Sequence, residues 1–169
     1  MFHVSRFTFH ERGFTLIELM IFSAIFVIIM VAFITIFITI TRVGSQQTSA
    51  AEVNQQSDFL LRQLQYYIEQ SSLVELAQDA ATSTLTLRMA ASSSDPTYIY
   101  LSNNAVYIRQ TNGGTAFPLT SNKVKVTSFT LTKRSNPPAY DSVSIAFTIA
   151  YNTSNTQQRS SRSLSTTIG

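Results

Sequence analysis

Cysteine is absent from the sequence of 169 residues, and histidine occurs only as His3 and His10. Without cysteine there is no disulfide framework, so a folded domain in this chain must be held by packing and by sheet hydrogen bonds. Residues 14–169 contain neither cysteine nor histidine. That part of the chain therefore lacks the side chains of Ser-His-Asp and Cys-His catalysis and of the usual zinc sites.

Closely spaced carboxylates are also scarce, so acid–base chemistry has few candidates. Five carboxylates are scattered through residues 69–141: Glu69, Glu75, Asp79, Asp95 and Asp141. A solvated helix surface or turn is the favoured interpretation of each. A calcium ion bound by the loops around Asp95 and Asp141 is the alternative for those two, although no cluster of alternating carboxylates supports it. We therefore expect no enzyme and no cofactor or metal site.

A strong excess of charge is missing as well. Twelve basic and nine acidic side chains give a net charge of +3, which is not the footprint of a protein that binds a phosphate backbone. The densest basic group lies in one predicted strand region: Lys123, Lys125, Lys133 and Arg134. A solvated sheet face is the favoured interpretation, and nucleic-acid binding by a competence-type filament is the alternative.

Charge, proline and glycine are all missing from Leu19 to Ile40. A helix rises about 1.5 Å per residue, so a helix of this length covers the hydrocarbon core of a bilayer. The basic residues Arg6 and Arg12 precede the run. By the positive-inside rule, this position of the arginines keeps the leader in the cytoplasm and places the rest of the chain, after the run, on the other side of the membrane. The run is too long for the apolar core of a secretory signal peptide, and no small-x-small site ends it. An uncleaved signal anchor would share this topology.

Between the basic leader and the apolar run lies the sequence Gly13-Phe14-Thr15-Leu16-Ile17-Glu18. It resembles the processing site of type IV prepilins and type II secretion pseudopilins. The resemblance implies cleavage between Gly13 and Phe14 by a prepilin peptidase, N-methylation of the new Phe14 amine, and pairing of Glu18 with the amine of a neighbouring subunit. An ammonium and a carboxylate in a low-dielectric helix bundle are each costly alone, and each relieves the other. The alternative is that Glu18 lies at interface depth and contacts lipid headgroups.

After Arg42 the sequence turns polar, and helical spacing then resumes. One stripe carries most of the apolar side chains, with Leu61 beside it: Val53, Leu60, Leu64, Tyr67 and Ile68. We expect this helix to continue to about Leu76 and its stripe to pack against the domain's own sheet. A filament-facing surface is the alternative.

From Ser83 the apolar period changes to two, which indicates strands. Asn103-Asn104 predicts a tight hairpin, a change of parity predicts a bulge near Thr127-Ser128, and Val143–Tyr151 is the clearest strand. We expect an α+β fold, in which a long N-terminal helix packs its second half on an antiparallel sheet of five to seven strands. The predicted segments are a leader (1–13), a transmembrane and assembly helix (14–42), its extramembrane continuation (43–80) and a sheet-rich head (81–169).

The leading hypothesis is therefore a non-catalytic, pilin-like filament subunit. Its implied partners are other pilin or pseudopilin subunits, prepilin peptidase, an inner-membrane assembly platform and the membrane itself. It would reside in the inner membrane with its C-terminal domain outside the cytoplasm, and then in a periplasmic or extracellular filament.

Major pilins usually carry a glycine and a proline in the membrane half of the helix and often a C-terminal disulfide loop. This chain lacks these features, and in this respect it resembles minor subunits of the pilin W or pseudopilin J kind. The alternative is a single-pass, membrane-anchored binding domain that does not polymerise. Twitching pili, DNA-uptake filaments and type II secretion systems all remain compatible with the sequence.

Overall fold

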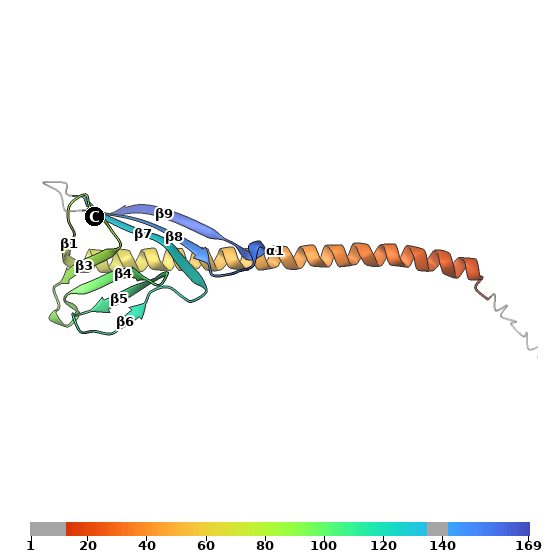
Figure 1. Cartoon of the computed structure of the whole chain (residues 1–169), viewed down its shortest axis with the longest axis horizontal. Coiled ribbons are helices and arrows are strands. Elements are labelled where there is room, and N and C mark those ends of the chain that lie inside the picture. The colour runs from red at the N-terminus through yellow and green to blue at the C-terminus, as the bar shows by residue number, and fades with distance from the viewer. Residues whose placement is uncertain (1–12, 135–141) are drawn as a thin grey trace, which may run out of the picture. The chain divides into compact units, whose positions relative to one another are not determined.

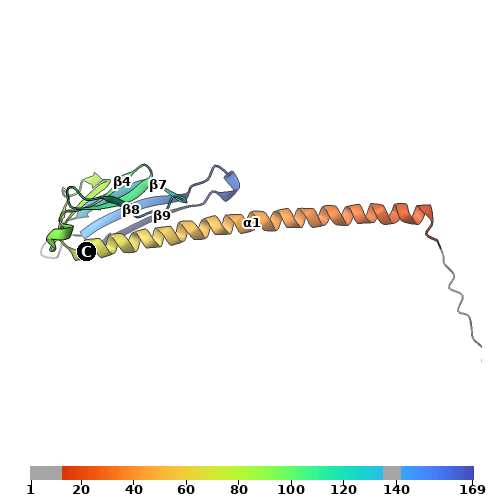
Figure 2. The same cartoon turned by 90° about the horizontal axis from the view of Figure 1, so that it is seen from below.

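The computed structural model of the chain describes residues 13–134 and 142–169. The chain divides into two units between Arg42 and Val43. One long helix, α1 (Leu16–Gln70), contributes to both units (Figure 1). The strands all lie in the second unit, where Figure 2 shows them on one side of the C-terminal part of α1.

In the second unit, one face of α1 is buried. Its buried residues recur every three or four positions: Ser49, Val53, Ser57, Leu60, Leu64 and Ile68. Leu61 and Tyr67 are partly buried at the margin of the same core. The predicted apolar stripe is therefore confirmed, and so is the prediction that it packs against the domain's own strands.

Ser49 and Ser57 are the two polar residues of this face, and the apolar pattern did not predict their burial. The Ser57 hydroxyl donates to the carbonyl of Val53 at 2.7 Å, and the Ser49 hydroxyl donates to the carbonyl of Ser45 at 3.0 Å. Both buried hydroxyls are thus satisfied within α1, which removes the cost of burying them. Their small side chains leave room for the strands that pack on this face of α1.

The helix ends at Gln70, so the prediction that it continues to about Leu76 was wrong. Ser71–Glu75 instead forms the first strand, β1. The next positions that would face the strands in a continued helix are Ser71 and Glu75, and a further turn would bury polar groups without adding apolar contact. The Ser71 hydroxyl donates to the carbonyl of Ile68 at 2.7 Å, which satisfies one of the last carbonyls of the helix.

The described residues form nine strands, more than the five to seven expected. They are β1 (Ser71–Glu75), β2 (Ala81–Thr82), β3 (Thr84–Met89), β4 (Thr97–Ser102), β5 (Ala105–Gln110), β6 (Ala116–Pro118), β7 (Val124–Arg134), β8 (Ser142–Tyr151) and β9 (Ser161–Ile168). Two short 3₁₀ helices, η1 (Ser92–Ser94) and η2 (Thr156–Gln158), lie in the connections.

These strands make two antiparallel sheets instead of the single sheet that was expected. The first has the order β1-β3-β4-β5-β6 and the second the order β2-β7-β8-β9. A period of two identifies strands but not their partners, so the division into two sheets could not be read from the sequence. The α+β architecture itself is confirmed: a long N-terminal helix packs its C-terminal part against antiparallel sheets.

Three local predictions in the head are confirmed. Asn103 and Asn104 have φ angles of 49° and 61° and close the β4–β5 hairpin. The register of β7 against β8 shifts between Val126 and Ser128, where the bulge was expected. In β8 the apolar side chains alternate inward along the strand, with Ile145 and Ile149 fully buried.

Polar contacts hold α1 on both flanks of its buried face. On one flank the Gln56 side chain accepts a hydrogen bond from the backbone N–H of Ser121 at 3.2 Å. On the other flank Arg162 of β9 donates to Asp58 at 2.9 Å. Both contacts join residues far apart in the sequence, so they fix the rotation of α1 about its axis against the strands.

Candidate processing and assembly site

The start of α1 is a reciprocal cap made by Thr15 and Glu18. The Thr15 hydroxyl accepts a hydrogen bond from the backbone N–H of Glu18 at 3.3 Å. In return, Oε2 of Glu18 lies 3.5 Å from both the backbone nitrogen and the hydroxyl oxygen of Thr15. This is a capping box, which satisfies helix N–H groups that have no partner inside the helix. The cap was not predicted from the sequence, although the Thr-x-x-Glu spacing of Thr15 and Glu18 is the signal for it.

Glu18 is also the acidic residue in the first turn of α1. A carboxylate there is favoured by the partial positive charge of the helix N-terminus. Its two contacts to Thr15 are at the long end of the hydrogen-bond range, so the carboxylate keeps acceptor capacity for another donor.

Gly13 and Phe14 precede this cap, and neither has a packing role in the described structure. The Phe14 side chain is 81% exposed. A Cβ atom added at Gly13 would have no heavy atom within 4 Å. The fold therefore gives no steric reason for a glycine at position 13.

The described part of the first unit, residues 13–42, is largely an apolar helical segment with its side chains exposed. From Phe14 to Ile40 the large apolar side chains are between 42% and 81% exposed. Its most apolar window has a mean hydropathy of 3.1, and by length and composition α1 is suited to cross a membrane. Exposing such a segment to water would cost free energy, and this cost supports anchoring of the segment in a membrane.

The few hydroxyls in this apolar segment are satisfied within the helix. Thr35 donates to the carbonyl of Val31 and Thr39 to that of Thr35, both at 2.9 Å. Ser23 donates to the carbonyl of Met20 at 3.0 Å. A lipid environment requires such internal partners, because it offers none of its own.

In the head, Asp95 is engaged by a neighbouring cation. Arg88 donates to its two oxygens at 3.0 and 2.7 Å, and the backbone N–H of Met89 donates to it at 2.9 Å. The Arg88 hydrogen bond, followed by that from Met89, lowers the pKa of Asp95 below its ordinary value, and Asp95 with Glu75 raises the pKa of Arg88. Asp95 thus serves as an ion-pair partner, whereas Asp141 lies outside the described residues.

Across 13–134 and 142–169, no group of three or more His, Cys, Asp or Glu side chains is placed to hold a metal ion.

The four basic residues considered for nucleic-acid binding do not share one face. Lys125 and Arg134 are exposed at opposite ends of β7. Lys133 points to the other side of the strand and donates to the carbonyl of Val74 at 3.2 Å, and Lys123 lies 3.5 Å from Glu52. The structure therefore does not bring these four side chains together.

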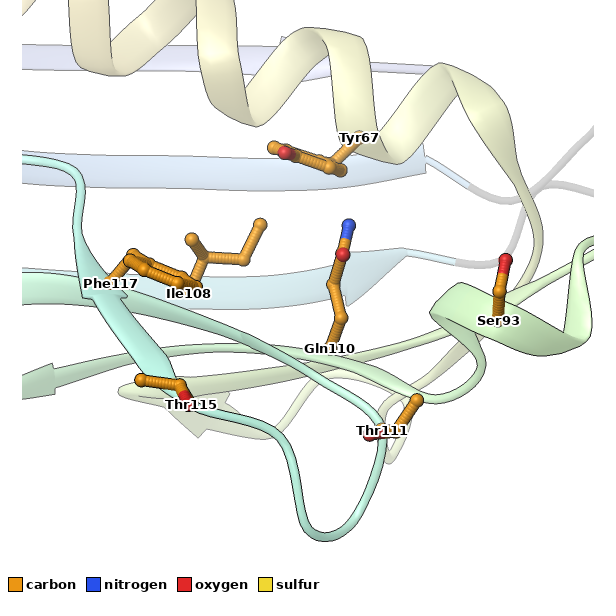
Figure 3. Close-up of a pocket in the computed structure, with 7 residues that line it drawn as sticks. All are labelled: Tyr67, Ser93, Ile108, Gln110, Thr111, Thr115 and Phe117. Carbon is orange, nitrogen blue, oxygen red and sulfur yellow. The ribbon is translucent and has the colours of Figure 1, made fainter.

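A cavity of about 420 Å³ lies between the end of α1 and the first sheet (Figure 3). Figure 3 shows Tyr67 above Ile108 and Gln110, with Phe117 beside them. The remaining lining residues are Ser93, Thr111 and Thr115. No carboxylate, histidine, cysteine or lysine is among the seven, so the polar groups that line the cavity are the phenol of Tyr67, the hydroxyls of Ser93, Thr111 and Thr115, and the amide of Gln110.

Comparison with known families gives one match. Residues 8–34 match the family described as the prokaryotic N-terminal methylation motif. No curated protein and no solved structure matches the chain. The matched segment contains Gly13, Phe14, the Thr15–Glu18 cap and the first part of the apolar helix. The chain thus carries a prepilin-type motif, and this match supports a relationship to the type IV pilins and pseudopilins.

Proposed function

We propose that this chain is a type IV pilin-like structural subunit. Its leader, residues 1–13, is removed by a prepilin peptidase that cleaves between Gly13 and Phe14, and the new Phe14 amine is methylated. The subunit waits in the inner membrane as a single-pass protein with its head outside the cytoplasm. It then enters a filament through residues 14–42. The observation that carries this proposal is the match of residues 8–34 to the N-terminal methylation motif.

The environment of Gly13 supports cleavage at this position. Nothing in the described fold contacts a Cβ atom placed there, so its identity is better explained by the peptidase that must accept it. The position is also accessible, because it precedes the first helical residue, Leu16.

Glu18 is the residue we assign to subunit pairing. Cleavage places a new ammonium group at Phe14, four residues before the Glu18 carboxylate. In a bundle of helices inside a membrane, an amine from one subunit and Glu18 of the next would neutralise each other. The requirement for this pairing would fix the axial register between neighbouring subunits.

Within this class we propose a minor subunit of the pilin W or pseudopilin J kind. The support is the absence of glycine and proline from Leu19 to Ile40, where major pilins usually carry both. The filament would be a twitching pilus, a DNA-uptake filament or a type II secretion pseudopilus. Its partners would be other pilin or pseudopilin subunits and the inner-membrane assembly platform.

A second candidate is a membrane-anchored binding domain that never polymerises. The capping box favours it, since Glu18 already has a local role at the helix start and needs no partner subunit to explain it. In that case α1 would serve only as an anchor, and Gly13 would be dispensable.

The mass of the N-terminal peptide, measured on protein from its native membrane, tests the proposal. A chain that begins at Phe14 and carries one additional methyl group is the expected result. A chain that still begins at Met1 in cells with active prepilin peptidase would contradict it and favour the anchored binding domain. Deleting the peptidase is the control: a pilin then accumulates at full length, whereas an anchor keeps its mass.

A further inference from the structure

Two sheets have four edge strands, and three of these carry features that hinder pairing with another chain. β1 follows α1 directly and has a register shift between Ser71 and Leu73. β2 has two residues, and β6 has three and ends in Pro118. Short strands, bulges and prolines are the usual means by which proteins protect sheet edges.

The fourth edge, β9, has none of these features. Its eight residues pair with β8 in unbroken register from Ser161 to Ile168. Figure 1 shows it at the rim of its sheet. The strand contains no proline and no lysine, and its one charged side chain, Arg162, is held by Asp58 of α1.

The hydrogen bonds of β8 determine which backbone groups of β9 face outward. The N–H of Tyr151 donates to the carbonyl of Ser160 at 2.8 Å. Because bonded and non-bonded pairs alternate in an antiparallel ladder, the even-numbered residues of β9 bond to β8. The odd-numbered residues direct their N–H and C=O groups to the free edge: Ser161, Ser163, Ser165 and Thr167. Within 13–134 and 142–169, these backbone groups have no hydrogen-bond partner on that side.

A groove of about 270 Å³ runs beside this edge. It is formed by Leu61, Gln65 and Glu69 of α1 and by residues 166–169 at the end of β9. Since Arg162 contacts Asp58 and the later residues of β9 lie beside Gln65 and Glu69, β9 runs parallel to α1. A strand added to β9 would therefore lay its inward side chains along this flank of α1.

The groove has a defined chemical character. Leu61 on α1, which lines the groove, is partly buried and is its apolar side chain on the helix. Glu69 is exposed, accepts a hydrogen bond from Gln65 at 2.7 Å, and has no cation within ion-pair distance among the described residues. Leu61 and Glu69 are about 12 Å apart along the helix at 1.5 Å per residue, which an extended chain covers in about four residues.

We propose that the free edge of β9 binds an extended segment of another protein by strand addition. The segment would place an apolar side chain against Leu61 and a lysine or arginine, about four residues away, against Glu69. Main-chain hydrogen bonds to Ser161, Ser163, Ser165 and Thr167 would supply the pairing, and the groove would supply the specificity.

The choice of another protein over a second copy rests on the proposed function. Because β9 runs parallel to the part of α1 that lies in the head, a twofold pair of β9 strands would set these parts of the two helices antiparallel. Subunits of the proposed filament all have the same orientation, so their heads would not meet through such a twofold pair.

The test uses the full chain in detergent and two fluorescent peptides of about nine residues. Each peptide is threonine-rich, with leucine and lysine four positions apart, and the two differ in the order of these residues. Saturable binding of one order is the expected result, measured by fluorescence anisotropy. The backbone amides of Ser163 and Ser165 should then exchange more slowly with solvent in the presence of that peptide. Binding of neither peptide, or concentration-dependent β9–β9 dimers that block binding, would overturn the proposal.

Two matched variants locate the binding. Ser165→Pro removes one N–H from the free edge and leaves the β8 ladder intact, so we expect about tenfold weaker binding, whereas Ser165→Ala should bind as the unmodified chain does. Glu69→Lys should weaken binding of the lysine peptide and restore binding of a peptide with glutamate in its place. Unchanged affinity in both Ser165→Pro and Glu69→Lys would overturn the assignment. The N-terminal mass of Ser165→Pro, measured in parallel, reports on prepilin processing separately.

Discussion

Thr15 and Glu18 cap the start of α1 for each other: the Thr15 hydroxyl accepts the Glu18 N–H at 3.3 Å, and the Glu18 carboxylate lies 3.5 Å from the Thr15 nitrogen. One carboxylate therefore has a local structural role and a proposed role between subunits. Glutamine can take the place of glutamate in a capping box, but it cannot neutralise an ammonium group. The two roles of Glu18 can thus be separated by substitution.

Glu18→Gln should keep the helix cap and lose filament entry, whereas Glu18→Ala should lose both. Both variants should insert into the membrane and be processed after Gly13. The measurement is the ratio of subunit in sheared filaments to subunit in membranes, and we expect a fall of at least about tenfold for both. Normal filament entry by Glu18→Gln with failure of Glu18→Ala would show that capping, and not charge pairing, is the function of this residue.

Thr15→Ala provides the reciprocal test of the cap. Loss of an N-cap hydroxyl costs about 0.5–2 kcal/mol of helix stability, and here the effect should be confined to the first turn. We expect increased exchange of the backbone amide of Glu18 with solvent in detergent and little change in filament entry. A loss of filament entry equal to that of Glu18→Ala would argue that the cap itself is needed for assembly.

Gly13→Val should block processing without changing the fold. A Cβ atom at this position meets no neighbour within 4 Å, so the helix content measured by circular dichroism and the unfolding midpoint should stay the same. The N-terminal mass should remain that of the full-length chain. Efficient cleavage of Gly13→Val between positions 13 and 14 would contradict our assignment of the glycine to peptidase recognition.

The sequence predicted the features that depend on local pattern. The Asn103-Asn104 hairpin follows from the tolerance of asparagine for positive φ, and the bulge in β7 follows from the change of apolar parity after Val126. The buried face of α1 follows from its helical period. The Thr15–Glu18 cap is equally local and was not predicted, although its Thr-x-x-Glu spacing is present in the sequence.

Features that depend on long-range pairing were not predictable in the same way. β1 continues directly from α1 and is paired with β3, so the state of Ser71–Glu75 depends on a strand that lies later in the chain. The separation into two sheets depends equally on partners, since β2 joins β7 and not its neighbour β3. Ser57 is fully buried because it lies on the face of α1 that packs against the strands, which its own polarity does not reveal.

Leu60→Ala and Phe59→Ala form a matched pair on α1. Leu60 is fully buried against the strands, whereas the adjacent Phe59 is 46% exposed. Truncating a buried leucine removes its transfer free energy and leaves a cavity, so Leu60→Ala should lower the free energy of unfolding of the head by about 2–5 kcal/mol. Phe59→Ala should lower it by less than about 1 kcal/mol. Chemical denaturation monitored by tyrosine fluorescence measures both, and equal losses would contradict the packing of this face.

The Arg88–Asp95 pair predicts a specific pH dependence of stability. The pKa of Asp95 is lowered in the folded state by the hydrogen bond from Arg88 and then by that from Met89. A lowered folded-state pKa means that the stabilisation is complete above the ordinary pKa of aspartate, about 3.9, and is lost as the pH falls through the lower folded-state value.

Asp95→Asn should therefore lower the unfolding midpoint at neutral pH, and its difference from the unmodified chain should shrink as the pH falls below about 4. Arg88→Gln should give a difference that shrinks in the same direction, because it removes the other half of the pair. In the double variant, the pH-dependent part of the change in unfolding midpoint should be no larger than in the more affected single variant. Both substitutions abolish the same interaction, so their effects should not add. A difference in unfolding midpoint between Asp95→Asn and the unmodified chain that instead stays constant from neutral pH to about pH 2 would contradict the ion-pair assignment. That result would attribute the effect of Asp95 to contacts that do not need its charge, such as the hydrogen bond from the Met89 N–H.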